Sequence, residues 1–222
     1  KKALAISSDH ILRGLEAAAA RVARTLTLSA DTTPSSPELK ARWNQLVTDD
    51  EEGAASAVTK APDEPHKRVL MLISRKIKAT RARDADLAYM GPAELIADLR
   101  LVQESLARAG ANRQAYGDLQ QLIWQVETFG FHLAELEVRQ HSLVHARALA
   151  DCEAGGKLSE ETEEVLEVFR TIAQLQRRYG TEAAGRYIVS FTQSSADLEN
   201  VYKLAHYAVG PVGTIPSLDV IP

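Results

Sequence analysis

The sequence predicts a mainly α-helical protein whose last part carries a few short parallel strands. Up to residue 129, apolar residues recur almost throughout at the spacing of a helix. After Gly130, helical segments alternate with three short strand-like runs, 133–139, 187–191 and 218–222. Strands separated by helices pair in parallel through right-handed crossovers. We therefore expect a helical region over 1–129 and a strand–helix–strand–helix–strand region over 130–222, part of an incomplete α/β barrel.

The helical region is expected to contain five helices. In the first, Leu12, Leu15, Val22 and other residues form one apolar stripe, and Ser36-Pro37 is an N-cap and first-turn pair for the second. Residues 48–64, acidic and then rich in alanine, are expected to form a surface loop. The predicted helices cover about 3–28, 37–47, 65–84, 92–110 and 114–129.

The helix predicted over 65–84 has a basic face opposite its apolar stripe. Two interpretations stay open: a site for phosphate or a regulatory anion, and a solvated face paired with the acidic loop before it. The second is the more typical use of such a charge run. The basic residues are Lys67, Arg68, Arg75, Lys76, Lys78, Arg81 and Arg83.

The region after Gly130 alternates helices and strands to its end. A helix begins at Ser142, and Ser159 caps a long helix that ends at Tyr179-Gly180. Ser194 and Asp197 have capping-box spacing for the next helix, with Asp in place of Glu, and Gly210-Pro211 stops it. Asp197 is expected to complement the helix dipole rather than to act in catalysis.

Composition narrows the class of protein. The net charge of −4 over 222 residues argues against a nucleic-acid surface, and no apolar run approaches the roughly 20 residues that cross a membrane. The single cysteine, Cys152, excludes an internal disulfide and fits a reducing cytosol; its neighbours Asp151 and Glu153 should raise the pKa of its thiol. The chain has no initiator methionine and stops within a predicted strand, so we expect a piece of a longer protein.

Arg139 is the strongest candidate functional residue. On a strand, residues two apart share a face, so Glu137 and Arg139 point the same way. A guanidinium at the carboxyl end of a strand stands where barrel enzymes place anion-binding groups. The structural alternative is a salt bridge from Arg139 to Glu137, Glu135 or another acid.

Two histidines close by are weaker candidates. His141 and His145 are four residues apart, as on a metal-binding helix face, but no third ligand at a compatible position accompanies them. We therefore expect surface or helix-capping histidines. His132, in the approach to the strand, is expected to pack its ring rather than transfer protons.

The segment around Arg139 resembles a known family. Thr128-Phe129-Gly130, Leu133 and Leu136-Glu137-x-Arg139-Gln140 together resemble the phosphoenolpyruvate carboxylases, in which this arginine lines the substrate site. The family usually has Asp where this chain has Glu137, and Gln140 is expected to support the site. Further resemblance lies at 94–106, 115–123, 187–198 and 218–222, where the family has Tyr-Ile-Ile-Ser-Met at the second strand.

The resemblance implies a cytoplasmic, homo-oligomeric lyase. The family joins phosphoenolpyruvate to bicarbonate with Mg²⁺ or Mn²⁺, giving oxaloacetate and phosphate, a carbon fixation that feeds the tricarboxylic acid cycle. Its essential histidine motif, its glycine- and arginine-rich mobile loop and its metal-binding carboxylates have no counterpart in this sequence. We therefore expect the metal ligands to lie outside this chain, and the chain alone to be inactive. The alternative is a non-catalytic helical interaction module.

Overall fold

The computed structural model describes residues 2–210, 215 and 217–222, and these form two compact units. The helical unit is Ala5–Leu133, and the sheet unit is Ala134–Pro222 together with the described residues up to Leu4 at the start of the chain. Each unit has its own apolar core. None of the helices in the described residues is both long and apolar enough to cross a membrane.

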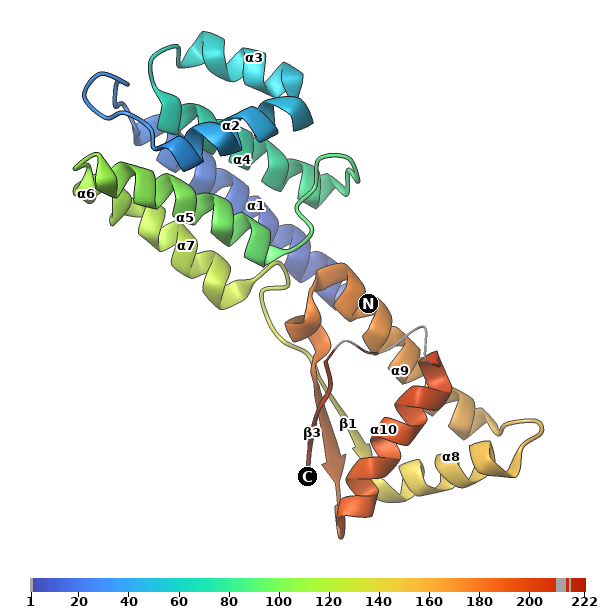
Figure 1. Ribbon diagram of the computed structural model, residues 1–222. Coiled ribbons are helices and arrows are strands. Elements are labelled where there is room, and N and C mark those ends of the chain that lie inside the picture. The colour runs from blue at the N-terminus through green and yellow to red at the C-terminus, as the bar shows by residue number, and fades with distance from the viewer. Residues whose placement is uncertain (1, 211–214, 216) are drawn as a thin grey trace. The chain divides into compact units, whose positions relative to one another are not determined.

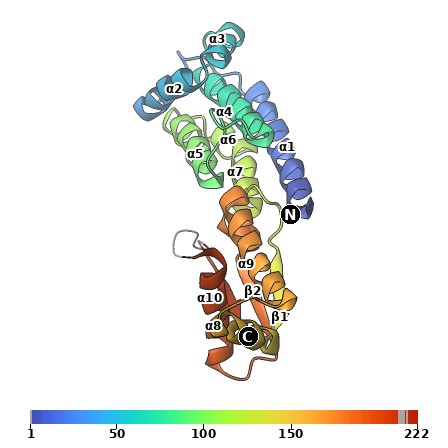
Figure 2. The same ribbon diagram turned by 90° about the vertical axis from the view of Figure 1, so that its right-hand side faces the viewer.

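The helical unit is built from amphipathic helices around one core (Figure 1 and Figure 2). Ile73, Leu99 and Ile123 are fully buried there, each on the apolar stripe of a different helix. Ser36 caps α2 as predicted, because its Oγ accepts the N–H of Leu39 at 3.2 Å. The helices are α1 (Lys2–Thr25), α2 (Pro37–Asp49), α3 (Glu51–Lys60), α4 (Pro65–Ala82), α5 (Pro92–Arg108), α6 (Asn112–Ala115) and α7 (Asp118–Phe129).

The predicted surface loop over 48–64 is wrong, because most of it is α3. Asp50 caps this helix by accepting the N–H of Gly53 at 2.8 Å. Gly53, Ala54 and Ala57 are buried, and such small side chains let α3 pack closely on α4. The helix predicted over 114–129 is likewise divided, at Gly117, into α6 and α7.

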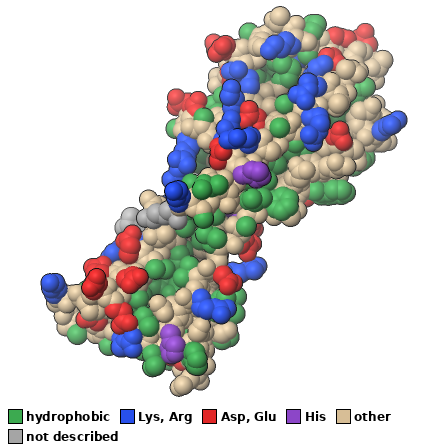
Figure 3. All heavy atoms as spheres, turned by 180° about the vertical axis from the view of Figure 1, so that it is seen from behind, with side chains coloured by type: hydrophobic (Ala, Val, Ile, Leu, Met, Phe, Trp, Pro, Cys, Tyr) green, Lys and Arg blue, Asp and Glu red, His purple; other side chains and the backbone are tan. Residues whose placement is uncertain are grey.

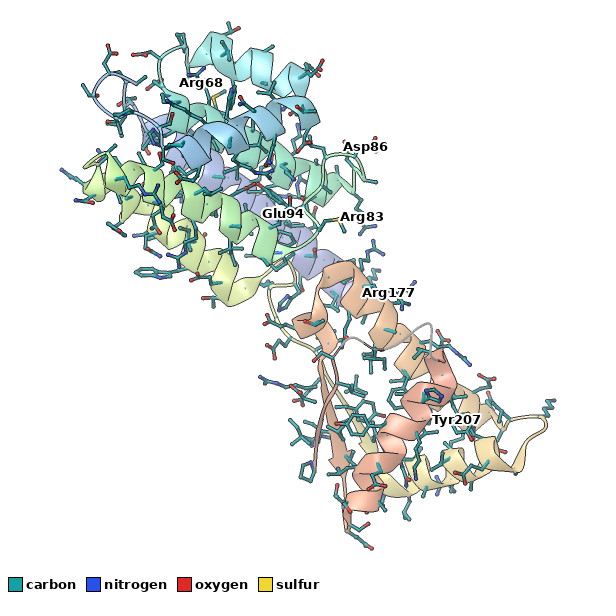
Figure 4. All side chains as sticks on the ribbon, in the orientation of Figure 1. Arg68, Arg83, Asp86, Glu94, Arg177 and Tyr207 are labelled. Atoms are coloured by element: carbon teal, nitrogen blue, oxygen red, sulfur yellow. The ribbon has the colours of Figure 1, made fainter. Side chains whose placement is uncertain are left out.

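Most of the basic face of α4 is paired with carboxylates. Arg75 donates to Asp50 at 2.6 and 3.0 Å, and Lys76 to Glu94 at 2.7 Å (Glu94 is labelled in Figure 4). Lys67 pairs with Glu64, and Arg81 pairs with Glu16. Figure 3 shows the Lys and Arg side chains of this unit with Asp and Glu among them. The predicted pairing with the acidic segment before the helix is therefore confirmed for Arg75 and Lys67, whereas Lys76 and Arg81 pair with carboxylates of α5 and α1.

A buried ionic group ties α2 to α5. Arg42 donates two hydrogen bonds to the Asp98 carboxylate, at 2.7 and 2.9 Å, and the hydroxyl of Tyr89 donates a third at 2.9 Å. The Asp98 residue is only 3% exposed. The three donors satisfy a carboxylate that burial alone would destabilise.

The sheet unit holds three parallel strands in the order β1–β2–β3, which confirms the predicted parallel pairing. Helices α8, α9 and α10 lie on one face of the sheet, where Phe169, Tyr187 and Val201 form the centre of the core. The elements are β1 (Glu137–His141), α8 (Ser142–Ala154), α9 (Glu160–Tyr179), a 3-10 turn (Thr181–Ala184), β2 (Arg186–Ser190), α10 (Ser195–Val209) and β3 (Asp219–Ile221).

The first strand differs from its prediction at both ends. It begins at Glu137 instead of 133, because Leu133 has a left-handed backbone with φ of 71°. It continues to His141, so Arg139 is its third residue and not its last.

The capping role of Asp197 is confirmed: its carboxylate accepts the N–H groups of Gln193 and Ser194 at 2.9 and 3.0 Å. Pro211, predicted to help stop that helix, lies outside the described residues.

Candidate functional site

The candidate site is the face of the sheet that α8, α9 and α10 do not cover. Val138 and Tyr187 are register partners that face the helices and pack in the core. Because side chains alternate along a strand, Arg139 and its partner Ile188 face the other way. Ile188 is in turn the partner of Ile221, so one row crosses all three strands on this open face.

Arg139 presents an uncommitted guanidinium on the open face. Among the described residues it forms no ion pair and no side-chain hydrogen bond. Glu135, one of its predicted structural partners, pairs instead with Arg186 at 3.3 Å. The salt-bridge alternative is therefore wrong for the described part of the chain. A free, planar guanidinium is suited to bidentate binding of a phosphate or carboxylate.

Glu137 and Gln140 have different surroundings. Glu137 is exposed on the same face as Arg139, two residues before it, and has no ion-pair partner in the region that the structure describes. Gln140 turns back on its own strand, where its Oε1 accepts the N–H of His141 at 2.8 Å. Gln140 thus contacts the end of its own strand, and its supporting role in the site stays a prediction.

The carboxyl ends of β1 and β2 are joined by an aromatic pair that sequence reasoning missed. The imidazole of His141 stacks on the ring of Phe191, with centroids 4.7 Å apart and an interplanar angle of 18°. Ser142 Oγ donates to the carbonyl of Phe191 at 2.8 Å. The available signal was the helix start directly after β1, which places His141 at a strand end and a helix cap at once.

His141 is a helix cap, as predicted, because its Nδ1 accepts the N–H of Leu143 at 3.1 Å. The prediction of a surface position is wrong for His145, which is fully buried with its Nε2 2.9 Å from the hydroxyl of Tyr187. Burial lowers the pKa of His145 to about 4. His132 is also buried, at 4% exposure, in agreement with its predicted packing role.

The remaining chemistry-bearing groups do not assemble a metal site. Within residues 2–210, 215 and 217–222, no three His, Cys, Asp or Glu side chains come together as metal ligands. The pKa of the Cys152 thiol is raised, as predicted, with burial as the main cause and Asp151 and other acids adding to it. A thiol of this kind is a poor nucleophile.

The geometry defines a class of protein. The sheet unit is an α/β unit whose parallel strands carry helices on one face. On the other face it presents the unpaired guanidinium of Arg139, at the middle of β1. Such an arrangement is suited to binding an anion at the carboxyl end of the sheet.

Comparison with known proteins gives the family. The family model described as phosphoenolpyruvate carboxylase matches residues 1–155 and 152–222. A phosphoenolpyruvate carboxylase of Xanthomonas campestris pv. campestris is 32% identical over 96% of this chain and 26% of its own length. One from Xanthomonas oryzae pv. oryzae is 33% identical over 91% and 25%. One from Gloeobacter violaceus is 30% identical over 65% and 21%.

The chain belongs to the phosphoenolpyruvate carboxylase family. It spans about a quarter of the length of the first two relatives. The resemblance carried by the Arg139 motif is thereby confirmed at the level of the family. Its relatives are named as enzymes, and Arg139 lies within the matched residues.

Proposed function

We propose that this chain is one part of a phosphoenolpyruvate carboxylase, a lyase that forms oxaloacetate and phosphate from phosphoenolpyruvate and bicarbonate. In this proposal Arg139 binds the phosphate of phosphoenolpyruvate. The observation that carries it is the guanidinium of Arg139 on the open face of the sheet, which forms no ion pair among the described residues. The family supports the reaction, because its members share this name.

The substrate explains why an uncommitted arginine is useful. Phosphoenolpyruvate carries a phosphate and a carboxylate, and a guanidinium already paired with Glu135 or Glu137 would have to break that pair to bind it. Two parallel N–H···O bonds fix the orientation of the phosphate as well as its position. A donor that is placed before the substrate arrives offsets charge without reorganisation during the reaction.

The open face of the sheet supports a barrel as the parent fold. In an (β/α)8 barrel every strand is followed by a helix, the helices form an outer ring and the inner faces of the strands line the barrel. β1, β2 and β3 fit that pattern, with helices on one face only. We propose that they are consecutive strands of such a barrel, and that the row through Arg139, Ile188 and Ile221 faces its interior.

The described residues do not form a site that fits the Mg²⁺ or Mn²⁺ of the proposed reaction. The open face has the carboxylates Glu137 and Asp219, but they lie on β1 and β3 with Arg186 of β2 between them in register. No cluster of three ligands exists among the described residues. We therefore propose that the metal ligands lie elsewhere in the parent enzyme.

A coupled assay tests the proposal. The full-length protein that contains this chain is incubated with phosphoenolpyruvate, bicarbonate and Mg²⁺, and oxaloacetate is reduced by malate dehydrogenase while NADH absorbance is followed. We expect NADH consumption that depends on both substrates and on the metal. A folded full-length protein that forms no oxaloacetate would overturn the proposal and favour the interaction module.

A further inference from the structure

We infer that His141 and Phe191 form a positioning pair for Arg139. Their stacked rings lock the carboxyl ends of β1 and β2 together, and so fix the place from which the guanidinium reaches its anion. The inference rests on the proposed function, because it names further residues that serve the same site. Neither residue is assigned contact with the substrate.

The stack of His141 and Phe191 lies on the same face of the sheet as Arg139. His141 is two residues beyond Arg139 on β1, and residues two apart on a strand share a face, about 6.6 Å apart along it. Ser190 is the register partner of His141, and Phe191 follows Ser190 directly. The rings therefore close the open face on the carboxyl side of Arg139 and bridge the two strands there.

Phe191 has a strained backbone and is exposed to solvent. Its φ is 61°, a left-handed conformation that a non-glycine residue adopts at a cost of about 1 kcal/mol or more, and the residue is 74% exposed. Such strain persists only where neighbours hold the residue in place. Here the stack with His141 and the hydrogen bond from Ser142 hold it.

Both contacts, the stack and the hydrogen bond from Ser142, connect Phe191 to the end of β1. His141 is the last residue of β1, its Nδ1 caps α8 through Leu143, and Ser142 begins α8 with no loop between. The strand end is thus held by the helix behind it and by the neighbouring strand. Since an error of about 1 Å in the placement of a catalytic group costs up to about 100-fold in rate, such a brace has functional value.

The test removes one ring and leaves the rest in place. In the full-length enzyme, Phe191→Leu keeps an apolar side chain and the same backbone strain, but loses the stack. We expect the KM for phosphoenolpyruvate to rise by roughly 10-fold, a loss of about 1.4 kcal/mol in binding, with kcat and the KM for bicarbonate within about 2-fold. Phe191→Tyr keeps the ring and should restore the normal KM. Tyr207→Leu, at a 50% exposed aromatic of α10 (labelled in Figure 4), is the matched control.

Two further variants separate positioning from general stability. His141→Asn can still cap α8, because asparagine is a good N-cap, but it has no ring to stack. It should therefore raise the KM for phosphoenolpyruvate as Phe191→Leu does. In an Arg139→Ala background, Phe191→Leu should have no further effect on that KM, because a pair that acts by positioning the Arg139 side chain cannot act once that side chain is removed.

The outcomes distinguish this inference from the proposed function. If Arg139→Ala weakens phosphoenolpyruvate binding while Phe191→Leu and His141→Asn leave the KM unchanged, the inference fails and the proposed function stands. Effects of Phe191→Leu and Arg139→Ala that simply add also overturn the inference. If Arg139→Ala itself has no effect, the proposed role of Arg139 fails first. Should Phe191→Leu not fold, the comparison of His141→Asn with the wild type decides the question.

Discussion

Arg139→Ala in the full-length enzyme is the perturbation that the structure describes most fully. Arg139 is exposed and has no ion-pair or side-chain hydrogen-bond partner in the described chain, so its removal strands no buried charge. The neighbours that hold β1 in place, Val138 in the core and the backbone pairing with β2, are unchanged. An exposed substitution of this kind changes folding stability by no more than about 0.5 kcal/mol.

The loss should therefore appear in the reaction. Removing one preorganised donor from a developing or bound anion costs roughly 2–4 kcal/mol of transition-state stabilisation. At 1.36 kcal/mol for each factor of ten, that is a decrease of about 30- to 900-fold in kcat/KM for phosphoenolpyruvate. Arg139→Lys keeps the charge but loses the planar fork, so it should already be impaired.

The assay is the coupled measurement of oxaloacetate with varied phosphoenolpyruvate, together with a thermal melt of each variant. Arg186→Ala is the matched control, since it removes an arginine from the amino end of the neighbouring strand on the same face. We expect it to change kcat/KM by less than about 3-fold, as for a residue whose ion pair with Glu135 is exposed. Near-normal kcat/KM for Arg139→Ala, with the protein folded, would refute the reasoning.

Three further predictions follow from the same structure. The isolated 222-residue chain should form no oxaloacetate from phosphoenolpyruvate, bicarbonate and Mg²⁺, because the described residues contain no group of three metal ligands. Loss of one member of a catalytic unit already lowers the rate by orders of magnitude, and oxaloacetate production by the pure chain would contradict the prediction. Asp98→Ala should lower the free energy of unfolding by roughly 3 kcal/mol in chemical denaturation, since it leaves Arg42 and Tyr89 without their buried acceptor. The control Arg13→Ala, at an ion pair whose side chains are 68% and 47% exposed, should cost less than about 1 kcal/mol. Equal effects of the two variants would show that burial of the ion pair does not matter. Burial lowers the pKa of His66 and of His145 to about 4, so as the pH falls the unfolded chain takes up protons before the folded one. The stability from these two groups should be complete above about pH 6.5 and should fall as the pH drops from there to about 4. The double variant His66→Gln/His145→Gln should flatten this loss in thermal melts, and an unchanged pH profile would refute the assignment.

The elements with long apolar periodicity could be predicted from the sequence, and the ones that depend on close packing could not. Strand–helix alternation was enough to predict parallel pairing, because few other topologies connect such elements. α3 was missed because its stripe consists of glycine and alanine, which carry little hydrophobic signal. Gly53 shows why: a Cβ at this position would occupy the space of the Asp50–Arg75 pair, so the helix needs a residue of low helix propensity there.

The charged residue of the site could be predicted from the sequence, whereas the contacts that hold its strand in place could not. Arg139 stands out in the sequence because a strand, a helix start and a family motif coincide there. The boundary of β1 depended on the left-handed backbone of Leu133, which no pattern of apolar residues indicates. Phe191 was counted as part of a buried strand, whereas it lies just beyond the strand and is exposed. Its contact with His141 joins residues 50 apart in sequence, a pairing that only the strand register determines.

The central claim is that Arg139 binds the phosphate of phosphoenolpyruvate from the open face of a parallel sheet. The measurement that tests it most directly is a crystal structure of the full-length enzyme with Mn²⁺ and an unreactive analogue of phosphoenolpyruvate. The account predicts two guanidinium nitrogens of Arg139 at about 2.7–2.9 Å from phosphate oxygens, with Glu137 outside ion-pair distance of Arg139. A bound analogue whose phosphate lies beyond about 4 Å from Arg139, with that arginine paired to Glu137 instead, would contradict it.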